Sequence, residues 1–264
     1  MTAVETGEDF RIGRVVSRLF QTLFGNLGVC LPLGLLLMIP LLLLNLYIAL
    51  SAPNTGLSPQ TALIAGGGGR MVLLIVGQAV LYIIFGYTLQ ASLTQATITY
   101  LNDEQPAFGP SLATGIKYFL PLIALGILSL LGMTLGMVLL IVPGIIVALM
   151  WSVVVPALVV EHTGIRDAFG RSRELTRGHR GKIFLLLLMY FVLAVGVGLV
   201  IRPLLGVSVL APNVGQMGVA YMVIEWLSRV VLALISSVGA TAIYYELRLV
   251  KEGIGAQQMA AAFD

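Results

Sequence analysis

Charged residues are scarce in this sequence. Only 10% of its 264 residues are Asp, Glu, Lys or Arg, whereas soluble domains carry about a quarter. The stretches 19–69, 118–160 and 183–201 contain no charged residue. A charged side chain at the bilayer centre costs about 2.5 to 3.5 kcal/mol on insertion scales. Together with 58% hydrophobic residues and a mean hydropathy of +1.01, this excludes a soluble protein and indicates an integral membrane protein.

Metal-ligating residues are also few. Cys30 is the only cysteine and lies in an apolar run, so neither a disulfide framework nor a cysteine metal site is available. His162 and His179 stand seventeen positions apart, and no HExxH pattern or other short ligand spacing occurs. We therefore expect no metal and no cofactor.

Catalytic motifs are missing as well. The glycine run at 65–70 lacks the GK[ST] ending of a phosphate-binding loop, and neither GxSxG nor a Ser-Lys arrangement occurs. The N-terminal ten residues have no small-residue cleavage site behind a short apolar stretch, so we expect no cleaved signal peptide. The sequence predicts a protein that is not an enzyme, with membrane lipids and an unknown protein as partners and no nucleic acid.

Long apolar runs dominate what is present. A helix that crosses the hydrocarbon core needs about 20 apolar residues. We predict an all-α, polytopic membrane protein that forms one membrane domain over 1–264. Its six spans are expected at 27–50, 71–94, 119–141, 145–160, 183–205 and 224–245.

The uncharged stretch 118–160 must fold back on itself. As one helix its 43 residues would be about 65 Å long, twice the thickness of the core. Pro143 and Gly144 form the preferred turn, because proline resists helix continuation and glycine tolerates any backbone angle. A turn at 132–136 is the alternative.

The distribution of Lys and Arg predicts the orientation. With six spans, twelve of the fifteen fall on the side of the two termini, six of them in the basic loop 161–182. Only Arg70 and Arg202 lie opposite, and Arg229 lies within a span. The positive-inside rule then predicts a bacterial inner-membrane protein with both termini, including the tail 246–264, in the cytoplasm.

Short amphipathic segments precede three of the spans. In 9–24, apolar residues follow helical spacing while Arg11, Arg14 and Arg18 occupy the other face, which predicts an interfacial helix that favours anionic headgroups. Similar segments precede spans three and five, and Gly13, Gly109 and Gly170 fall at comparable places. We infer three repeats, each an interfacial helix followed by a transmembrane hairpin.

The basic loop offers one candidate binding site. Arg171, Arg173, Arg177 and Arg180 could recognise a lipid headgroup or another phosphodiester. The alternative, which we favour at this stage, is that these arginines only enforce the topology.

Glu225 and Arg229 offer a second candidate. They stand four residues apart near the outer end of the sixth span and can pair on one helix face, where Arg202 could join them. A structural clamp is the simpler interpretation, and a transport or proton-relay role is the alternative. Polar residues also crowd the second span and could line an aqueous path, although hydrogen bonds between helices are the commoner explanation. These residues are Thr88, Gln90, Ser92, Thr94, Gln95 and Thr97.

The stretch LLIVPGIIVALMWSVVVPALVVEHTGIRDAFGRSRELTRGHRGKIF and the closing TAIYYELRLVKEG resemble a bacterial six-helix inner-membrane family. That family includes the membrane domain fused to some glycerophosphoryl diester phosphodiesterases. The matching positions include Pro143, Gly144, Glu161, Ser172, Gly178, Tyr245 and Arg248. The resemblance implies topology rather than catalysis, because the phosphodiesterase chemistry resides in a separate soluble barrel that is missing here.

Two functional classes are favoured over a third, an intramembrane lipid enzyme. The first is a non-enzymatic membrane module that anchors or modulates a partner or binds anionic lipid, linked by architecture to glycerophospholipid metabolism. The alternative is a small-solute or ion transporter that uses the polar face of the second span and the Glu225 and Arg229 pair.

Overall fold

The computed structural model describes residues 10–51, 68–205 and 219–253, and the regular elements in these ranges are α-helices. Six of these helical segments are long and apolar enough to cross a membrane, which confirms the predicted fold class. Which side of the membrane each end faces stays a prediction. The loop after the first span, the connection 206–218 and most of the predicted tail lie outside the described residues.

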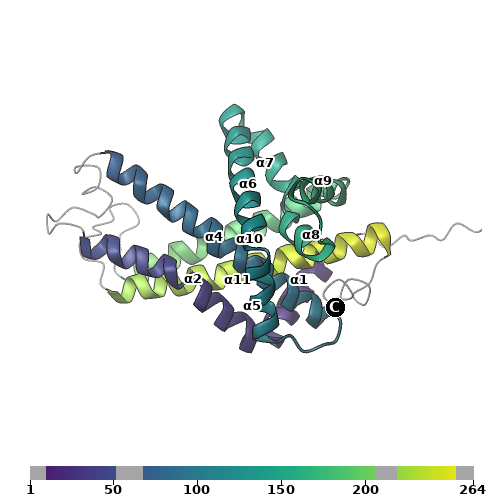
Figure 1. The fold of residues 1–264 in the computed structure, drawn as a ribbon, viewed down its shortest axis with the longest axis horizontal. Coiled ribbons are helices and arrows are strands. Elements are labelled where there is room, and N and C mark those ends of the chain that lie inside the picture. Colours follow the sequence, from purple (N-terminus) through teal and green to yellow (C-terminus); the bar gives the residue numbers. More distant parts are fainter. Residues whose placement is uncertain (1–9, 52–67, 206–218, 254–264) are drawn as a thin grey trace, which may run out of the picture.

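The chain repeats one order of elements three times (Figure 1). Each time a short amphipathic helix leads into a pair of long apolar segments. The first set is α1 (Ile12–Gly25), α2 (Leu27–Ser51) and α4 (Gly68–Leu101). The second is α5 (Phe108–Lys117), α6 (Phe119–Leu139), α7 (Ile141–Met150) and α8 (Val154–Glu161). The third is α9 (Ile165–Thr176), α10 (Arg180–Leu204) and α11 (Val219–Glu252).

The turn between the third and fourth spans was predicted wrongly. The chain reverses at Leu140, whose backbone is extended, and Pro143 lies in the first turn of α7. A proline is tolerated there because its missing N–H would have no partner within the helix. Glycine instead permits close packing across the turn: a Cβ on Gly136 would lie 2.9 Å from the Cα of Gly144.

The fourth span was predicted as one helix, but it is broken into α7 and α8. Trp151, Ser152 and Val153 form the break. Pro156 explains it, because its ring lacks an N–H and would clash with the carbonyl four residues earlier, on Ser152. The sequence contains this proline, so the break was predictable.

The sixth span is much longer than the expected 224–245. α11 has 34 residues, so its length is about 51 Å against a hydrocarbon core of about 30 Å. It continues past Tyr245 because Glu246, Arg248 and Glu252 find charged partners on α1, α8 and α9. These three charged residues therefore join the C-terminal part of α11 to the rest of the fold.

α11 is the centre of the bundle and α10 lies at its edge. α11 packs against α1, α2, α4, α8, α9 and α10. In its most apolar stretch 67% of residues are buried, against 6% in that of α10. Figure 1 shows α2, α4 and α11 along the long axis, with α6 and α7 standing across them. Many large apolar side chains of α6 and α10 are exposed, as expected for helices that face lipid.

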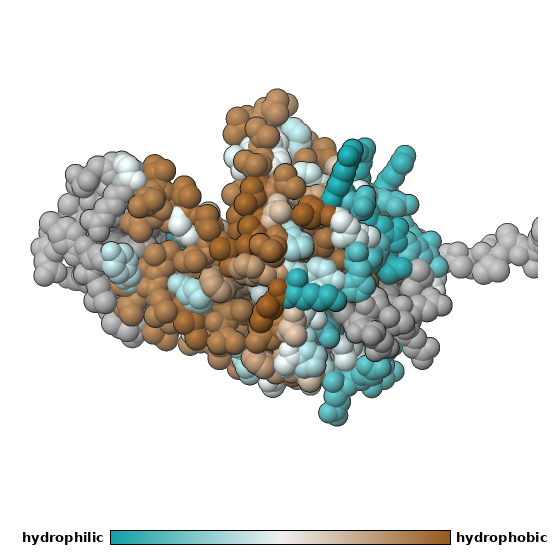
Figure 2. Space-filling view, viewed as in Figure 1, coloured by the Kyte–Doolittle hydropathy of each residue, from teal (hydrophilic) through white to brown (hydrophobic). Residues whose placement is uncertain are grey.

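Polar residues gather at one end of the molecule. In Figure 2 hydrophilic side chains cover the end where α8, α9 and the C-terminal part of α11 meet, while the rest of the visible face is largely apolar. We call the region formed by α1, α8, α9 and the C-terminal part of α11 the charged end. The candidate site lies there.

Candidate functional site

Glu246 is the centre of a first ionic network at the charged end. Its side chain is completely buried, and Arg14 donates a hydrogen bond from Nε to its Oε1 over 2.8 Å. Arg18 bonds the other carboxylate oxygen, and the backbone N–H of Arg11 donates to Oε1 over 3.3 Å. A buried carboxylate without partners would be very costly, so these donors on α1 make its burial possible.

Two further contacts join the N-terminal helix to its neighbours. The guanidinium of Arg18 lies 4.5 Å from the ring centre of Tyr245, a cation–π geometry. Lys182, at the start of α10, donates from Nζ to the carbonyl of Phe10 over 2.8 Å. Charged groups thus hold α1 to α11 and the residue Phe10, just before α1, to α10.

These contacts correct the interpretation of α1. Its arginines were expected to face anionic headgroups, but Arg14 and Arg18 are directed at Glu246. The exposed side of α1 instead carries Phe20 and Phe24, which are 46% and 65% exposed and stack with their ring centres 5.9 Å apart. The sequence alone did not reveal a buried carboxylate more than 200 residues away.

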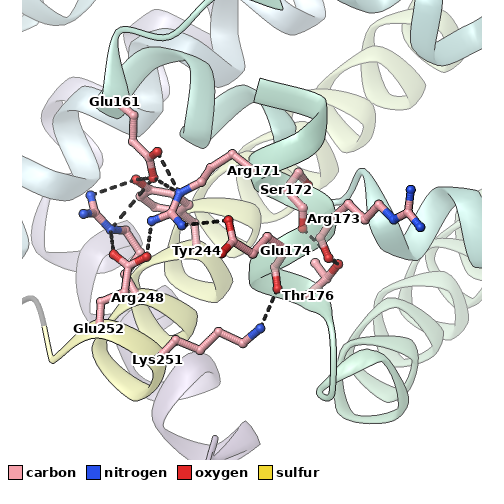
Figure 3. A network of polar contacts seen from close by, with 10 residues as sticks. All are labelled: Glu161, Arg171, Ser172, Arg173, Glu174, Thr176, Tyr244, Arg248, Lys251 and Glu252. Atoms are coloured by element: carbon pink, nitrogen blue, oxygen red, sulfur yellow. Dashed lines mark hydrogen bonds and ion pairs between the residues drawn. The ribbon is translucent and has the colours of Figure 1, made fainter. Parts of the chain in front are cut away.

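Glu161 is the centre of a second ionic network, drawn in Figure 3. Arg171 of α9 donates from Nε to both carboxylate oxygens of Glu161, over 2.9 and 2.8 Å. The hydroxyl of Tyr244 on α11 donates to Oε1 over 2.9 Å. Glu161 ends α8, so this carboxylate ties together three helices.

Glu252 completes the second network from the end of α11. It pairs with Arg171 and accepts a hydrogen bond from Nε of Arg248 over 2.9 Å. Arg171 also reaches Glu174 at 3.3 Å. Burial opposes ionisation of Arg171, but the hydrogen bonds and charges of Glu252 and Glu161 outweigh it and raise the pKa of Arg171 above its ordinary value.

The four arginines predicted to bind phosphate therefore have different environments. Arg171 is fully engaged by carboxylates, and Arg180 is partly buried at the start of α10. Arg173 and Arg177 are exposed, and Figure 3 shows Arg173 pointing away from the network. Among the described residues, neither of these two side chains forms an ion pair with a carboxylate.

Arg166 belongs with the exposed arginines, although the sequence analysis did not select it. It is exposed in the first turn of α9. Arg166, Gly170 and Arg173 follow the spacing i, i+4 and i+7, which places them on one face of α9, and Arg177, at i+11, directly follows the end of the helix. We call these four residues the arginine strip. This spacing was available in the sequence, because α9 was expected to be helical.

Buried contacts fix the opposite face of α9. Ser172 is completely buried and donates from Oγ to the carbonyl of Met150 over 2.7 Å. The ring of Phe169 meets Trp151 edge-on with 4.8 Å between centres. After α9 ends, Gly178 adopts φ +89°, a left-handed conformation that favours glycine, and the chain turns into α10. These contacts hold α9 in one orientation and leave the arginine strip outward.

The Glu225 and Arg229 pair lies far from the charged end along α11. Nη2 of Arg229 is 2.8 Å from Oε1 of Glu225, and the two side chains are 58% and 30% exposed. The side chain of Arg202, which was expected to join them, lies outside the described residues. The pair is thus formed as predicted, and its role stays a prediction.

The polar residues of the second span are mostly packed inside the bundle. Thr88, Ser92, Thr94 and Thr97 are buried in α4. The hydroxyls of Thr94 and Thr241 lie 3.1 Å apart, which links α4 to α11, and Thr114 of α5 bonds the amide of Gln95. These contacts favour interhelical hydrogen bonding over an aqueous path.

The two histidines occupy separate surroundings. His162 directly follows α8 in a left-handed conformation, and its Nδ1 bonds the hydroxyl of Tyr118. The ring of His179 lies 5.6 Å from that of Phe10. In the part of the chain that the structure describes, no three His, Cys, Asp or Glu residues come together as a possible metal site.

The helices and their charged end define a multi-span membrane protein. Within this class, residues 107–247 match the family described as "Domain of unknown function (DUF7847)". The match covers just over half of the chain, and the chain belongs to this family. It includes Glu161, Glu246 and all of α9, but not α1. No curated protein and no solved structure matches the chain. The resemblance to the membrane domain of glycerophosphoryl diester phosphodiesterases stays a prediction.

Proposed function

We propose that the protein is a non-enzymatic membrane module whose charged end binds anionic lipid and thereby anchors or modulates a partner at the membrane surface. The observation that carries this proposal is the division of the arginines into two groups. Arg14, Arg18 and Arg171 are neutralised by buried or partly buried glutamates. Those of the arginine strip are left exposed on a helix that is itself rigidly held.

Electrostatics supports lipid as the ligand. A membrane surface rich in anionic lipid attracts a juxtamembrane cation by about 1 kcal/mol. α9 ends only four residues before α10 begins, so its exposed arginines lie close to the level where a span leaves the membrane. A link to glycerophospholipid metabolism would then follow from the lipid bound rather than from any chemistry performed by the chain.

Lipid retention tests the proposal. The full chain is reconstituted in phosphatidylcholine bilayers with a minor fraction of phosphatidylglycerol, extracted in mild detergent and analysed for bound lipid by mass spectrometry. We expect phosphatidylglycerol to be enriched over its bulk fraction. The variant Arg166→Gln/Arg173→Gln/Arg177→Gln should lose this enrichment.

The matched control is Arg229→Gln, which removes an exposed arginine far from the charged end. It should retain the enrichment of wild type. If the lipid retained by wild type simply mirrors the bulk composition, the proposed function is wrong. A separate incubation with phosphatidylglycerol and glycerophosphodiesters checks the non-enzymatic part, because release of any hydrolysis product would contradict it.

A further inference from the structure

Gly170 occupies an exposed position in the middle of α9 without a packing reason. A Cβ built on it would meet nothing within 4 Å, and its backbone is not among those with positive φ. Glycine in a helix interior is less favourable than alanine by about 1 kcal/mol. Neither close approach within the fold nor backbone conformation therefore accounts for this glycine.

The surroundings of Gly170 are basic. Arg166 lies one turn before it and Arg173 one turn after it, so two guanidiniums flank a patch of bare backbone. From the helical rise, the Cα atoms of these arginines are about 10 Å apart along the axis. Their long side chains can converge over Gly170, and Arg177 extends the same strip.

The acidic residues of α9 are directed elsewhere. Glu174 lies on the neighbouring row of the helix, but its carboxylate is engaged by Arg171 at 3.3 Å. The carboxylate of Asp167 lies at the start of the helix, 3.3 Å from where a Cβ of Gly164 would stand. The arginine strip therefore keeps three positive charges beside a surface that has room for a ligand.

We propose that Gly170 is the floor of a phosphate site, in which Arg166 and Arg173 clamp the phosphate of an anionic phospholipid headgroup. The site rests on the proposed function and deepens it by naming the atoms that bind. Arginine matches phosphate oxygens through two parallel N–H donors, and a side chain at position 170 would occupy the space between the two arginines. The lipid of the surrounding membrane is the source, because the chain itself spans that membrane.

The variant Gly170→Leu distinguishes a defined phosphate site from general electrostatic attraction of the lipid by the arginines. The substitution retains every arginine and replaces glycine by a better helix former, so the variant should fold at least as well. Binding of dihexanoyl phosphatidylglycerol to the detergent-solubilised full chain is measured by isothermal titration calorimetry. We expect an affinity about tenfold weaker for Gly170→Leu and for Arg173→Gln, as for the loss of one charge-assisted hydrogen bond.

Gly13→Leu is the matched control. Gly13 is also exposed near the start of a basic amphipathic helix, and a Cβ there meets nothing within 4 Å. This variant should bind like wild type. Glycerophosphoglycerol, which offers the same phosphodiester without acyl chains, should compete only at much higher concentration.

The possible results are distinct. If wild type prefers phosphatidylglycerol over dihexanoyl phosphatidylcholine and Gly170→Leu binds equally well, the site is wrong and the proposed function stands. If wild type shows no such preference, both are wrong. If glycerophosphoglycerol displaces the lipid at equal concentration, the ligand is a soluble phosphodiester and the assignment to lipid is overturned.

Discussion

α1 and α9 are both basic amphipathic helices, yet their arginines do opposite things. α1 directs Arg14 and Arg18 inward to a buried carboxylate and presents Phe20 and Phe24 to its surroundings. α9 directs only Arg171 inward and leaves the arginine strip exposed. The comparison shows that the basicity of a helix does not tell which face is charged. The position of the glutamates on neighbouring helices decides it.

The largest expected effect comes from removing the carboxylate that neutralises α1. Glu246→Gln removes the carboxylate that Arg14 and Arg18 share in a mostly buried place. We expect a loss of about 3 kcal/mol in the free energy of unfolding, the low end for a broken buried ion pair because both guanidiniums are partly exposed. Thermal unfolding of the full chain in detergent measures this.

A triple variant distinguishes unpaired charge from lost packing. Arg14→Gln/Arg18→Gln/Glu246→Gln removes all three charges together, and replacing a complete buried ionic group is often nearly neutral. It should recover most of the stability lost in Glu246→Gln. A triple variant as unstable as the single one would show that α1 is not held by this network.

Removing the carboxylate that binds α9 should cost less. In Glu161→Gln, Arg171 still pairs with Glu252 and Glu174, so it loses only part of the negative charge that neutralises it. We expect a loss of about 1 to 2 kcal/mol, seen as a lower unfolding temperature. Glu174→Gln, at a side chain that is 70% exposed, is the control and should change little. Equal losses in both variants would contradict the central role of Glu161.

Replacing two glycines of the same region by alanine should change the stability of the fold in opposite directions. Gly178→Ala places a Cβ in a left-handed conformation and should destabilise the fold by about 1 kcal/mol. Gly170→Ala removes a helix-interior glycine that contacts nothing, and should stabilise it by about 0.5 to 1 kcal/mol. Thermal unfolding compares the two. A destabilised Gly170→Ala would reveal a structural need for this glycine and weaken the phosphate site.

The smallest effect is expected at the far end of α11. Arg229 is more than half exposed, and exposed ion pairs contribute about 0 to 1 kcal/mol before further screening. Glu225→Gln should therefore leave the unfolding temperature nearly unchanged. Solute or proton flux in proteoliposomes tests the transporter alternative at the same time. A flux in wild type that Glu225→Gln abolishes would favour transport over a structural pair.

Sequence patterns predicted the six spans because the bilayer requires about 20 consecutive apolar residues in each span. A signal over that many residues does not depend on any single one. The order of amphipathic helix and hairpin followed from helical spacing in the same way. The turn at Leu140 was missed because proline and glycine each occur both in turns and in the first turn of a helix. The break at Trp151 required noticing that Pro156 disturbs a carbonyl four residues earlier.

The candidate site was less predictable than the fold. Arg173 and Arg177 were selected from the sequence, but nothing in the sequence distinguished them from Arg171. The difference depends on Glu161 and Glu252, which come from two other helices. Arg166 and Gly170 could have been added from helical spacing alone. Pairings over such sequence distances depend on tertiary packing, and local patterns do not encode them.

The pairing of α1 with Glu246 also has a consequence for biosynthesis. Arg14 and Glu246 are separated by 232 positions, and the glutamate lies on α11. Translation proceeds at about 5 to 20 residues per second, so Glu246 is synthesised on the order of tens of seconds after α1. During this interval Arg14 and Arg18 lack the carboxylate that they share in the folded protein. The first hairpin can therefore insert early, but its leading helix can adopt its final position only after Glu246 has been synthesised.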